Sequence, residues 1–335
     1  MYENIQLDKE AIISQALSII DPQYEQRTEK YLLKSRRDLR YTLDFTLEAL
    51  IIKQKSILIN YYKWLIETLA RYQISEKTLL KMFDSLQDLL LPYLNQTDQV
   101  IIKSITKEDI LNNLKQPVKR LALNEESQAY LDLLLKKDRK EAFSYIQSKA
   151  KNRESINHIY LDIIQPAMEE IGYLWQYRLI NVADEHLATV ITQYVMSGLY
   201  PFIFDTPKHG KKLVALALGD ELHEIGIRMV ADLFEYAGFQ TTYLGANMPT
   251  SSIIDHALKY QPDLLAVSIT LGNHLSKLTT LMDSLRNHPA LRNLKVMIGG
   301  QAVAKIPDAV AIFKADGFAF DGQSAVKVGE QLVGI

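Results

Sequence analysis

The segment Glu221-Leu-His223-Glu-Ile-Gly226 carries the residue types of a metal ligand and its support. A neutral imidazole is a common metal ligand, and a carboxylate two residues earlier can accept the second ring N–H, which orients the imidazole and raises its basicity. Gly226 has no side chain and therefore admits a close approach by a bound group. The segment predicts that His223 binds a metal with Glu221 behind it. The alternative is a surface loop in which Glu and His occur together by chance.

A second segment places an indole ahead of a carboxylate and an imidazole. Nine residues separate Trp175 from the pair Glu185-His186, and helical patterns put the indole at the end of one helix and the pair at the start of the next. An indole presents a large rigid surface that can stack on a purine or shield a reactive bond from water. The alternative is that Trp175 belongs to a helical core and that the pair forms a solvated helix start.

The elements that must position these residues change in kind near residue 210. Before it lie long segments with helical apolar spacing, and after it short β-branched runs alternate with helical patterns. We expect strands at 214–218, 241–244, 264–269, 295–298 and 317–320, and helices at 225–237, 250–259, 275–287, 302–313 and 323–333. Such alternation predicts a doubly wound parallel sheet.

The first two thirds of the chain are predicted to be helical, so the fold class is multidomain α and α/β. Residues 1–118 form an all-α module, in which Thr106-Lys-Glu-Asp109 resembles a capping box and Gln116-Pro117 ends the last helix. A four-helix bundle follows within 119–204, and 205–212 is expected to be an exposed connector to a third domain, 211–335. The four helices of the bundle are expected at about 126–136, 138–149, 154–174 and 180–198.

Ligands of open parallel sheets bind beyond the carboxyl ends of the strands, which is where His223, Ser268 and Gly299-Gly300 are expected. The combination of Glu221-x-His223-x-x-Gly226, Ser268-Ile-Thr270 and Gly299-Gly300 resembles the cobalamin-binding domain family, which has a flavodoxin-like or Rossmann-like fold. Two departures from the family pattern are Glu221, where Asp is usual, and Thr270, where Leu is common and Leu271 follows one place later. Small residues suit the close approach of a nucleotide tail.

The resemblance implies that His223 is the lower axial ligand of cobalt and displaces the dimethylbenzimidazole tail into a slot between sheet and helices. Glu221 would orient the imidazole. The residues of this domain that the resemblance implies at the cofactor are Glu221, His223, Glu224, Ile225, Gly226, Ser268, Thr270, Leu271, Gly299 and Gly300.

The Trp-x(9)-Glu-His spacing resembles the CarH-type light-dependent cobalamin regulators, in which a helical bundle caps the upper face of adenosylcobalamin. The resemblance implies that Trp175 packs over the adenosyl group and that Val182, Glu185 and His186 also contact the cofactor. Gln176 stands where the best-known members have a histidine that binds cobalt after photolysis. Water, His186 or His158 would then have to replace the lost upper ligand, although His158 is expected to be a buried or interfacial residue.

The other histidines are expected to be structural or solvated, with His274 near enough to the third strand to border the corrin. They are His209, His256, His274 and His288.

Composition narrows the function further. The 335 residues carry 38 Lys and Arg against 40 Asp and Glu, so no overall attraction to nucleic acid is implied. The absence of cysteine excludes disulfides, thiolate metal sites and cysteine nucleophiles. No signal peptide pattern opens the sequence and no apolar stretch approaches the roughly 20 residues of a membrane helix, so we expect a cytoplasmic protein that contacts no membrane.

We expect the module at 1–118 to pass the signal of the cofactor domains to another molecule. Its sequence offers no DNA-binding pattern. The family's repressors have a MerR-type winged helix-turn-helix there, which this sequence lacks. Its one basic cluster, at 34–40, is short and interrupted by Asp38, as is typical of a solvated helix face. We therefore expect signalling through a protein partner of this module, without direct DNA binding.

The leading hypothesis is a regulatory cobalamin sensor that responds to light and is not an enzyme. Adenosylcobalamin is the expected cofactor, with methylcobalamin and hydroxocobalamin as alternatives. Two other functions stay open: a corrinoid carrier that shuttles a methyl group in a methyltransferase system, and a sensor that responds to cobalamin occupancy without light. Assembly into a homo-oligomer also stays open.

Overall fold

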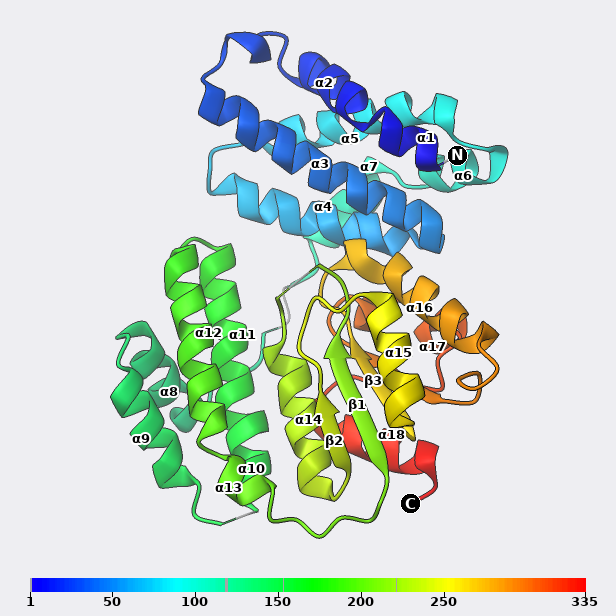
Figure 1. Cartoon of the computed structure of the whole chain (residues 1–335). Helices are drawn as coiled ribbons and strands as arrows, with labels where there is room; N and C mark the ends of the chain where they lie inside the picture. Colours follow the sequence, from blue (N-terminus) through cyan, green and yellow to red (C-terminus); the bar gives the residue numbers. More distant parts are fainter. Residues whose placement is uncertain (1, 118–119, 153, 221) are drawn as a thin grey trace. The chain divides into compact units, whose positions relative to one another are not determined.

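The computed structural model describes residues 2–117, 120–152, 154–220 and 222–335. The chain divides into two compact units, 1–118 and 119–335, each of which is described by itself (Figure 1). In the described ranges, no helix has both the length and the apolar character needed to cross a membrane.

The first unit is helical throughout, as expected. Its aromatic core includes the buried Tyr62, which packs edge-on against Phe83 with ring centroids 5.2 Å apart. The last helix begins at the capping box of Thr106 and Asp109 and ends before Gln116-Pro117. The helices are α1 (Tyr2–Leu7), α2 (Lys9–Ile20), α3 (Glu29–Ile52), α4 (Lys55–Ala70), α5 (Glu76–Leu90), α6 (Gln96–Lys103) and α7 (Lys107–Leu114), with short 3₁₀ turns at Tyr24–Gln26 and Leu91–Tyr93.

The basic cluster of the first unit lies on α3 and faces acidic partners. Arg36 and Arg40 both form ion pairs with Glu10 of α2. Lys34 lies over the ring of Tyr72, with its Nζ 3.7 Å from the ring centroid. Partial neutralisation of this kind agrees with a solvated helix face.

The second unit begins with the helical bundle. Its helices are α8 (Glu125–Leu135), α9 (Arg139–Lys149), α10 (Ser155–His158), α11 (Gln165–Gln176), α12 (Val182–Ser197) and α13 (Tyr200–Ile203). They enclose an apolar core in which Tyr130, Tyr160 and Ile191 are buried. Tyr130 and Thr192 share a buried hydrogen bond of 3.1 Å between their hydroxyl groups.

The helix expected at 154–174 is not one regular α-helix, and Pro166 explains the difference. Proline has no N–H to donate to the carbonyl oxygen of Asp162 four residues earlier. The side-chain amide of Asn124 donates to that oxygen instead, at 2.9 Å. The backbone adapts with a π-helical segment, Ile159–Ile164, between α10 and α11.

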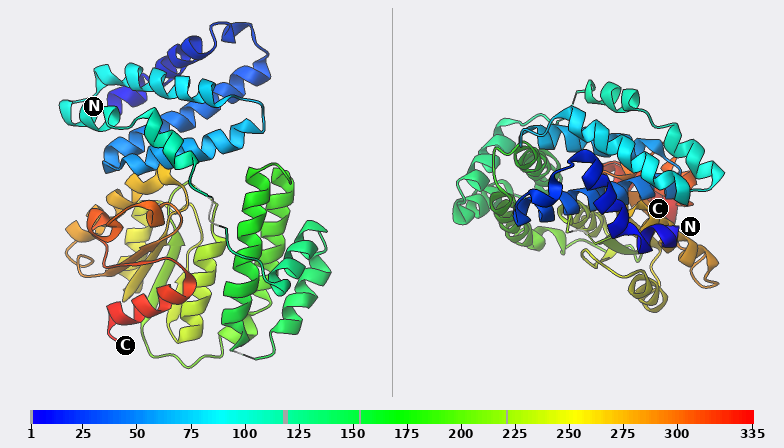
Figure 2. Two further views of the ribbon diagram at one scale, coloured as in Figure 1. Left: turned by 180° about the vertical axis from the view of Figure 1, so that it is seen from behind. Right: turned by 90° about the horizontal axis from the view of Figure 1, so that it is seen from above.

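The sheet domain has five parallel strands in the order β2-β1-β3-β4-β5, which is the flavodoxin-like order. The strands are β1 (Lys212–Ala217), β2 (Gln240–Tyr243), β3 (Leu264–Ser268), β4 (Lys295–Gly299) and β5 (Gly317–Ala319). Helices α14 (Ile225–Ala237) and α18 (Gly322–Val333) pack on each other and on one face of the sheet. Helices α15 (Thr250–Tyr260), α16 (Leu275–Asn287) and α17 (Ala309–Phe313) pack in succession around the other face (Figure 2). The predicted doubly wound parallel sheet is confirmed.

One local expectation about this domain was wrong. The helix expected at 302–313 is interrupted because Pro307 forces Ile306 into an extended conformation, so that only a 3₁₀ turn (Val303–Lys305) and the short α17 form. The connector expected at 205–212 is exposed over most of its length, as expected, but it is anchored at two points. Within it Thr206 is buried, and the ring of His209 packs edge-on against Phe239 at 4.6 Å between centroids.

Helix α14 joins the sheet to the bundle because it is apolar on two sides. Phe234 and Ile227 belong to the core beneath the sheet, whereas Met229 and Leu233 belong to the core of the bundle. The sheet, α14 and the bundle therefore form successive layers, and the loop that precedes α14 lies where the layers meet at one end (Figure 1).

Candidate cofactor site

A row of small residues crosses the sheet at the carboxyl ends of its strands. Ala217 of β1 pairs in register with Ser268 of β3, Ser268 with Gly299 of β4, and Gly299 with Ala319 of β5. Residues in register on parallel strands point to the same face, and Ala217 and Ala319 belong to the core beneath α14 and α18. The row therefore lies between the sheet and these two helices, where large side chains would otherwise fill the space.

Gly299 and Gly300 at the end of β4 could not be replaced without a clash. Gly300 has φ +92°, and a Cβ there would lie 2.7 Å from the backbone nitrogen of Ile269. A Cβ on Gly299 would approach the carbonyl oxygen of Ala319 to 2.9 Å. Both glycines are thus required by the chain itself. Thr270 and Leu271, which follow β3, are half-buried beside them.

His223 lies in the loop between β1 and α14 and is exposed. Glu221, its expected partner, lies outside the described residues. Gly219, earlier in this loop, has φ +110° and packs against the ring of His274. The neighbouring Asp220 forms an ion pair of 2.7 Å with Lys277, and the hydrogen bond from this lysine lowers the pKa of Asp220.

The residues that follow His223 turn toward the bundle. Glu224 accepts hydrogen bonds from Gln193 of α12 and from Tyr243 of β2. Ile225 is half-buried and packs against the bundle core. Gly226 is exposed, and a Cβ there would meet nothing within 4 Å. Because the chain itself has room for a larger residue at Gly226, its lack of a side chain leaves space on the outside of α14.

The residues expected at the upper face lie around the turn between α11 and α12. Trp175 is 39% exposed and lies at the surface, which contradicts the alternative that it is a core residue of the bundle. Val182, the first residue of α12, is also exposed. Glu185 binds His186 at 2.5 Å between Oε2 and Nδ1, and the side chain of His186 is 73% exposed.

The turn between α11 and α12 and the carboxyl ends of the strands lie at the same end of the second unit. Helix α11 ends and α12 begins at the end toward which the strands of the sheet point (Figure 1). The structure therefore brings the turn that carries Trp175 and the loop that carries His223 to one end, although they are distant in sequence.

The remaining histidines have structural surroundings. His158 was expected to be buried or interfacial, but its side chain is 46% exposed, and its ring nitrogens bind Asp162 and Glu126, which raise the pKa of the imidazole. Both nitrogens are thereby engaged. His274 is buried beneath the His223 loop. The others contact their own surroundings: His209 packs on Phe239, His256 stacks on Tyr260, and His288 accepts from the amide of Ala290.

A cavity of about 200 Å³ opens beside the His223 loop at the carboxyl ends of β1 and β2. The sequence-based prediction missed most of its lining because the loop after β2 carries no residue of obvious chemistry. Only the sheet order, which places β2 next to β1, brings that loop beside Gly219 and Asp220 at the start of the His223 loop. The lining residues are Leu218, Gly219, Asp220, Asn247, Met248, Pro249, Thr250 and Lys277.

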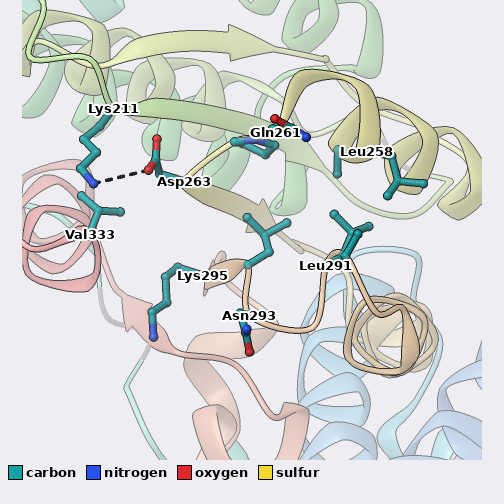
Figure 3. Close-up of a pocket in the computed structure, with 12 residues that line it drawn as sticks. Lys211, Leu258, Gln261, Asp263, Leu291, Asn293, Lys295 and Val333 are labelled. Atoms are coloured by element: carbon teal, nitrogen blue, oxygen red, sulfur yellow. Dashed lines mark hydrogen bonds and ion pairs between the residues drawn. The ribbon is translucent and has the colours of Figure 1, made fainter.

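A larger hollow of about 400 Å³ lies at the opposite edge of the sheet, at the amino ends of the strands (Figure 3). Lys211 before β1 and Asp263 before β3 line it and form an ion pair of 3.4 Å. Lys295, the first residue of β4, also lines it. It is separate from the residues predicted from the sequence motifs.

The residues present fit a cobalamin. An exposed imidazole at the carboxyl end of β1 can approach cobalt. The row of small residues places no bulky side chain between the sheet and α14, where a nucleotide tail would have to insert. The exposed indole of Trp175 offers an apolar surface of the kind that covers a bound group. The histidine, the small residues and the indole come from different elements, so the fold rather than any one motif assembles them.

Comparison with known proteins supports this assignment. Two family models, both described as B12 binding domain, match residues 127–200 and 211–327. The transcriptional repressor CarH of Myxococcus xanthus is 27% identical over 146 residues, a match that covers 42% of this chain but only 46% of the repressor. Dimethylamine corrinoid protein 1 of Methanosarcina acetivorans is 24% identical over 202 residues, which cover 58% of this chain and 92% of that protein.

A solved structure confirms the fold of the second unit. The monomethylamine corrinoid protein of Methanosarcina barkeri superposes with a TM-score of 0.53 at 20% identity, covering 61% of this chain and 96% of that protein. The bundle and the sheet domain thus coincide in extent with the two matched families. The chain is therefore a cobalamin-binding domain protein, in which residues 127–200 and 211–327 belong to the B12 binding domain family.

Proposed function

We propose that this protein is a cobalamin-dependent regulatory sensor that responds to light, with adenosylcobalamin as its preferred cofactor and His223 as the lower axial ligand of cobalt. The observation that carries the proposal is the position of Trp175. Its large indole is 39% exposed, and Trp175 lies in the last turn of α11, which ends at the end of the bundle toward which the strands of the sheet point. An indole supplies a rigid apolar surface that can cover the upper ligand.

Each part of the site has its own task. His223 holds the lower face, with Glu221 as the proposed partner of its second ring nitrogen. Ser268, Thr270 and Leu271 lie along the tail with the glycines Gly299 and Gly300. Ile225 and Gly226, at the start of α14, lie beside the corrin. At the upper face Trp175, Val182, Glu185 and His186 contact the upper ligand. When bound, adenosylcobalamin supplies a cobalt–carbon bond that visible light can break.

The three parts of the chain divide the work of a sensor. Residues 211–335 bind the cofactor, residues 119–204 cap its upper face, and residues 1–118 carry the output. Trp175 and Glu185 hold the cap in one position only while an upper ligand is present for them to contact. When that ligand is lost, Trp175 and Glu185 no longer favour this position, and the cap shifts to a second position.

The proposed output is a contact between residues 1–118 and a protein partner. In the basic cluster of α3, Arg36 and Arg40 are paired with Glu10, and Arg37 is paired with Asp38. This partial neutralisation reduces the positive charge that the cluster could offer to a phosphate backbone. The protein then acts as a regulator and not as an enzyme.

A second function is favoured by one observation from the comparisons. The match to dimethylamine corrinoid protein 1 covers 92% of that protein, whereas the match to CarH covers 46% of the repressor. A corrinoid carrier would hold methylcobalamin and pass its methyl group to a partner enzyme. A sensor of cobalamin occupancy would use the same site with no response to light.

Loading the purified protein with adenosylcobalamin in darkness tests the proposal. Absorption and size-exclusion profiles are recorded before and after green light. The proposal expects a spectral change with an altered size or shape. A spectral change with unchanged size and shape would favour occupancy sensing, and preferential binding of methylcobalamin would favour the carrier.

The two tryptophans of the chain provide a matched pair of variants. Trp175→Ala is expected to weaken adenosylcobalamin binding more than methylcobalamin binding, because only the adenosyl group extends to the indole. Trp64→Ala removes an indole of nearly equal exposure, 38% against 39%, from the first unit. Equal losses in the two variants would overturn the role of Trp175. His186→Ala tests whether this histidine replaces the lost ligand, because the spectrum after illumination should then change.

A further inference from the structure

The carboxylate of Glu224 connects three elements at the base of the His223 loop. Its Oε1 accepts a hydrogen bond of 2.6 Å from the side-chain amide of Gln193 on α12. Its Oε2 accepts a hydrogen bond of 2.9 Å from the hydroxyl of Tyr243 on β2. Both oxygens of one carboxylate are therefore committed, one to the cap and one to the sheet.

This arrangement differs from the ordinary role of a residue at this position. Glu224 is the N-cap of α14, where a side chain usually accepts from the free backbone N–H groups of the first turn. Within the described part of the chain its side chain makes no such bond. Its carboxylate is thus used for contacts between elements rather than for capping. All three side chains are half-buried, and burial with the hydrogen bond to Glu224 raises the pKa of Tyr243.

Helix α12 carries residues of the proposed upper face and also the partner of Glu224. Glu185 and His186 lie in its first turns, at the proposed upper face, and Gln193 follows two turns later on the same helix. At a rise of about 1.5 Å per residue, His186 and Gln193 are about 10 Å apart along the axis. A continuous helix moves as a unit, so a displacement at His186 also displaces Gln193 from Glu224.

Glu224 is in turn the immediate neighbour of His223 in the chain. The loop between β1 and α14 ends at Glu224, the residue before the helix. The side chain of Glu224 is held by its hydrogen bonds to Gln193 and Tyr243. Loss of one of them leaves the residue after His223 with fewer constraints on its backbone.

We propose that Glu224 is a positioning residue that couples the two faces of the cofactor: its hydrogen bond to Gln193 holds the His223 loop in its ligating position while α12 is docked. This inference rests on the proposed role of His223 as lower ligand. Release of α12 at the upper face breaks the bond to Gln193 and loosens the lower ligand. The bond to Tyr243 remains, so the loop stays attached to the sheet.

The rest of the interface can persist while this contact breaks. Tyr160 donates to Asp232 at 2.7 Å farther along α14, and Arg228 donates to Tyr200 at 2.8 Å. These contacts involve the π-helical segment and the start of α13, not the first turns of α12. Arg228 also donates to Ser197, the last residue of α12, at 2.9 Å. These contacts hold the far end of α12 and form a pivot about which its first turns can swing.

A double-mutant cycle between Gln193 and His223 tests the coupling. The dissociation constant of hydroxocobalamin is measured by absorbance for the wild-type protein, Gln193→Leu, His223→Ala and the double variant. Gln193→Leu is expected to weaken binding about tenfold in the wild-type background, the size of one lost hydrogen bond to a charged group. In the His223→Ala background its effect is expected to be no more than about twofold, because there is then no ligand to position.

Three outcomes are informative in different ways. A loss of affinity that is equal in both backgrounds overturns the coupling, since Gln193 would then act independently of His223. No loss in the wild-type background overturns it as well. Unchanged affinity of His223→Ala itself would instead remove the lower ligand on which the inference rests, and so separates failure of the proposed function from failure of the inference.

Two further variants guard against a general loosening of the fold. Tyr243→Phe removes a single hydroxyl from the opposite side of Glu224 and is expected to weaken binding in the same direction. Gln147→Leu is the matched control, because this half-buried glutamine of the bundle donates to the carbonyl oxygen of Gly198 at 2.9 Å and does not contact Glu224. An effect of Gln147→Leu as large as that of Gln193→Leu would overturn the proposal.

Discussion

Tyr160 of the bundle donates a hydrogen bond of 2.7 Å to Oδ2 of Asp232 on α14, and both side chains are buried. The bond joins the π-helical segment of the cap to the helix that follows the His223 loop. A carboxylate in this position is costly unless it is neutral or compensated. Burial raises the pKa of Asp232 to about 6, against the opposing effects of Tyr160 and of Arg228 nearby, whereas the charge of Glu235 adds to the rise.

Asp232 therefore makes stability depend on pH in a defined direction. The folded state holds the proton more tightly than the unfolded state, so the contribution of Asp232 is fully present below pH 3.8 and is lost as pH rises to about 6. A shift of this size corresponds to about 3 kcal/mol. Asp232→Asn keeps an oxygen that accepts the hydrogen bond from Tyr160, and it cannot ionise, so the loss of stability with rising pH disappears. We expect the unfolding free energy of Asp232→Asn, relative to wild type, to increase by about this amount between pH 4 and pH 7.

Urea unfolding followed by far-UV circular dichroism at a series of pH values measures this difference. The exposed Asp132→Asn on α8 is the matched control and should follow the wild-type profile. A difference between Asp232→Asn and wild type that stays constant with pH would show that Asp232 does not carry the effect.

Gly300→Ala is expected to destabilise the sheet domain. The substitution places a side chain at φ +92° and drives its Cβ into the backbone of Ile269, which can relieve the overlap only by moving a strand end. A loss of at least about 1–3 kcal/mol follows, measured as a lower midpoint of thermal unfolding. Gly172→Ala on the exposed surface of α11 is the control, because a Cβ there meets nothing within 4 Å and alanine favours the helix. Equal melting of the two variants would contradict this account.

Gly226→Ala separates binding from folding. The chain has room for a Cβ at this position, so stability should be unchanged or slightly higher. If the corrin or its lower ligand approaches the start of α14 closely, the added methyl group should weaken cobalamin binding. Equilibrium titration with hydroxocobalamin, together with a melting curve, checks both parts. Wild-type affinity in Gly226→Ala would show that this face of α14 does not contact the cofactor.

Isotope labelling can identify the lower ligand directly. In cobalt(II) cobalamin an axial ¹⁴N splits each cobalt line of the electron paramagnetic resonance spectrum into a triplet, whereas ¹⁵N gives a doublet. We expect doublets from protein labelled with ¹⁵N-histidine, and their loss in His223→Ala. The half-buried His288→Ala is the control and should keep them. Triplets in the labelled wild-type protein would mean that the cofactor's own base remains bound.

Most of the fold could be predicted from the sequence because its information is local. Alternation of β-branched runs with helical patterns indicated all five strands near their observed positions, and the helix at 225–237 has the predicted bounds. The prediction failed at Pro166 and Pro307, where one residue changes the backbone of an otherwise helical pattern. At Pro166 the outcome depended on Asn124, a partner distant in sequence.

The candidate site was predictable only in part. The sequence motifs marked His223, Trp175 and the glycine pair, since each has a recognisable residue type at a recognisable spacing. The role of Glu224 was not visible in them, because its partners Gln193 and Tyr243 are ordinary residues until the fold brings them together.

The sequence by itself determined the order of helical and α/β parts, the absence of thiol chemistry and the resemblance to cobalamin-binding domains. Only the tertiary structure decided that Ala217, Ser268, Gly299 and Ala319 form one row across the sheet, and that α14 lies between sheet and bundle. The reason is physical. Periodicity and turn residues indicate the local structure of a segment. Strand register and the packing of layers depend on contacts between segments that are distant in the sequence.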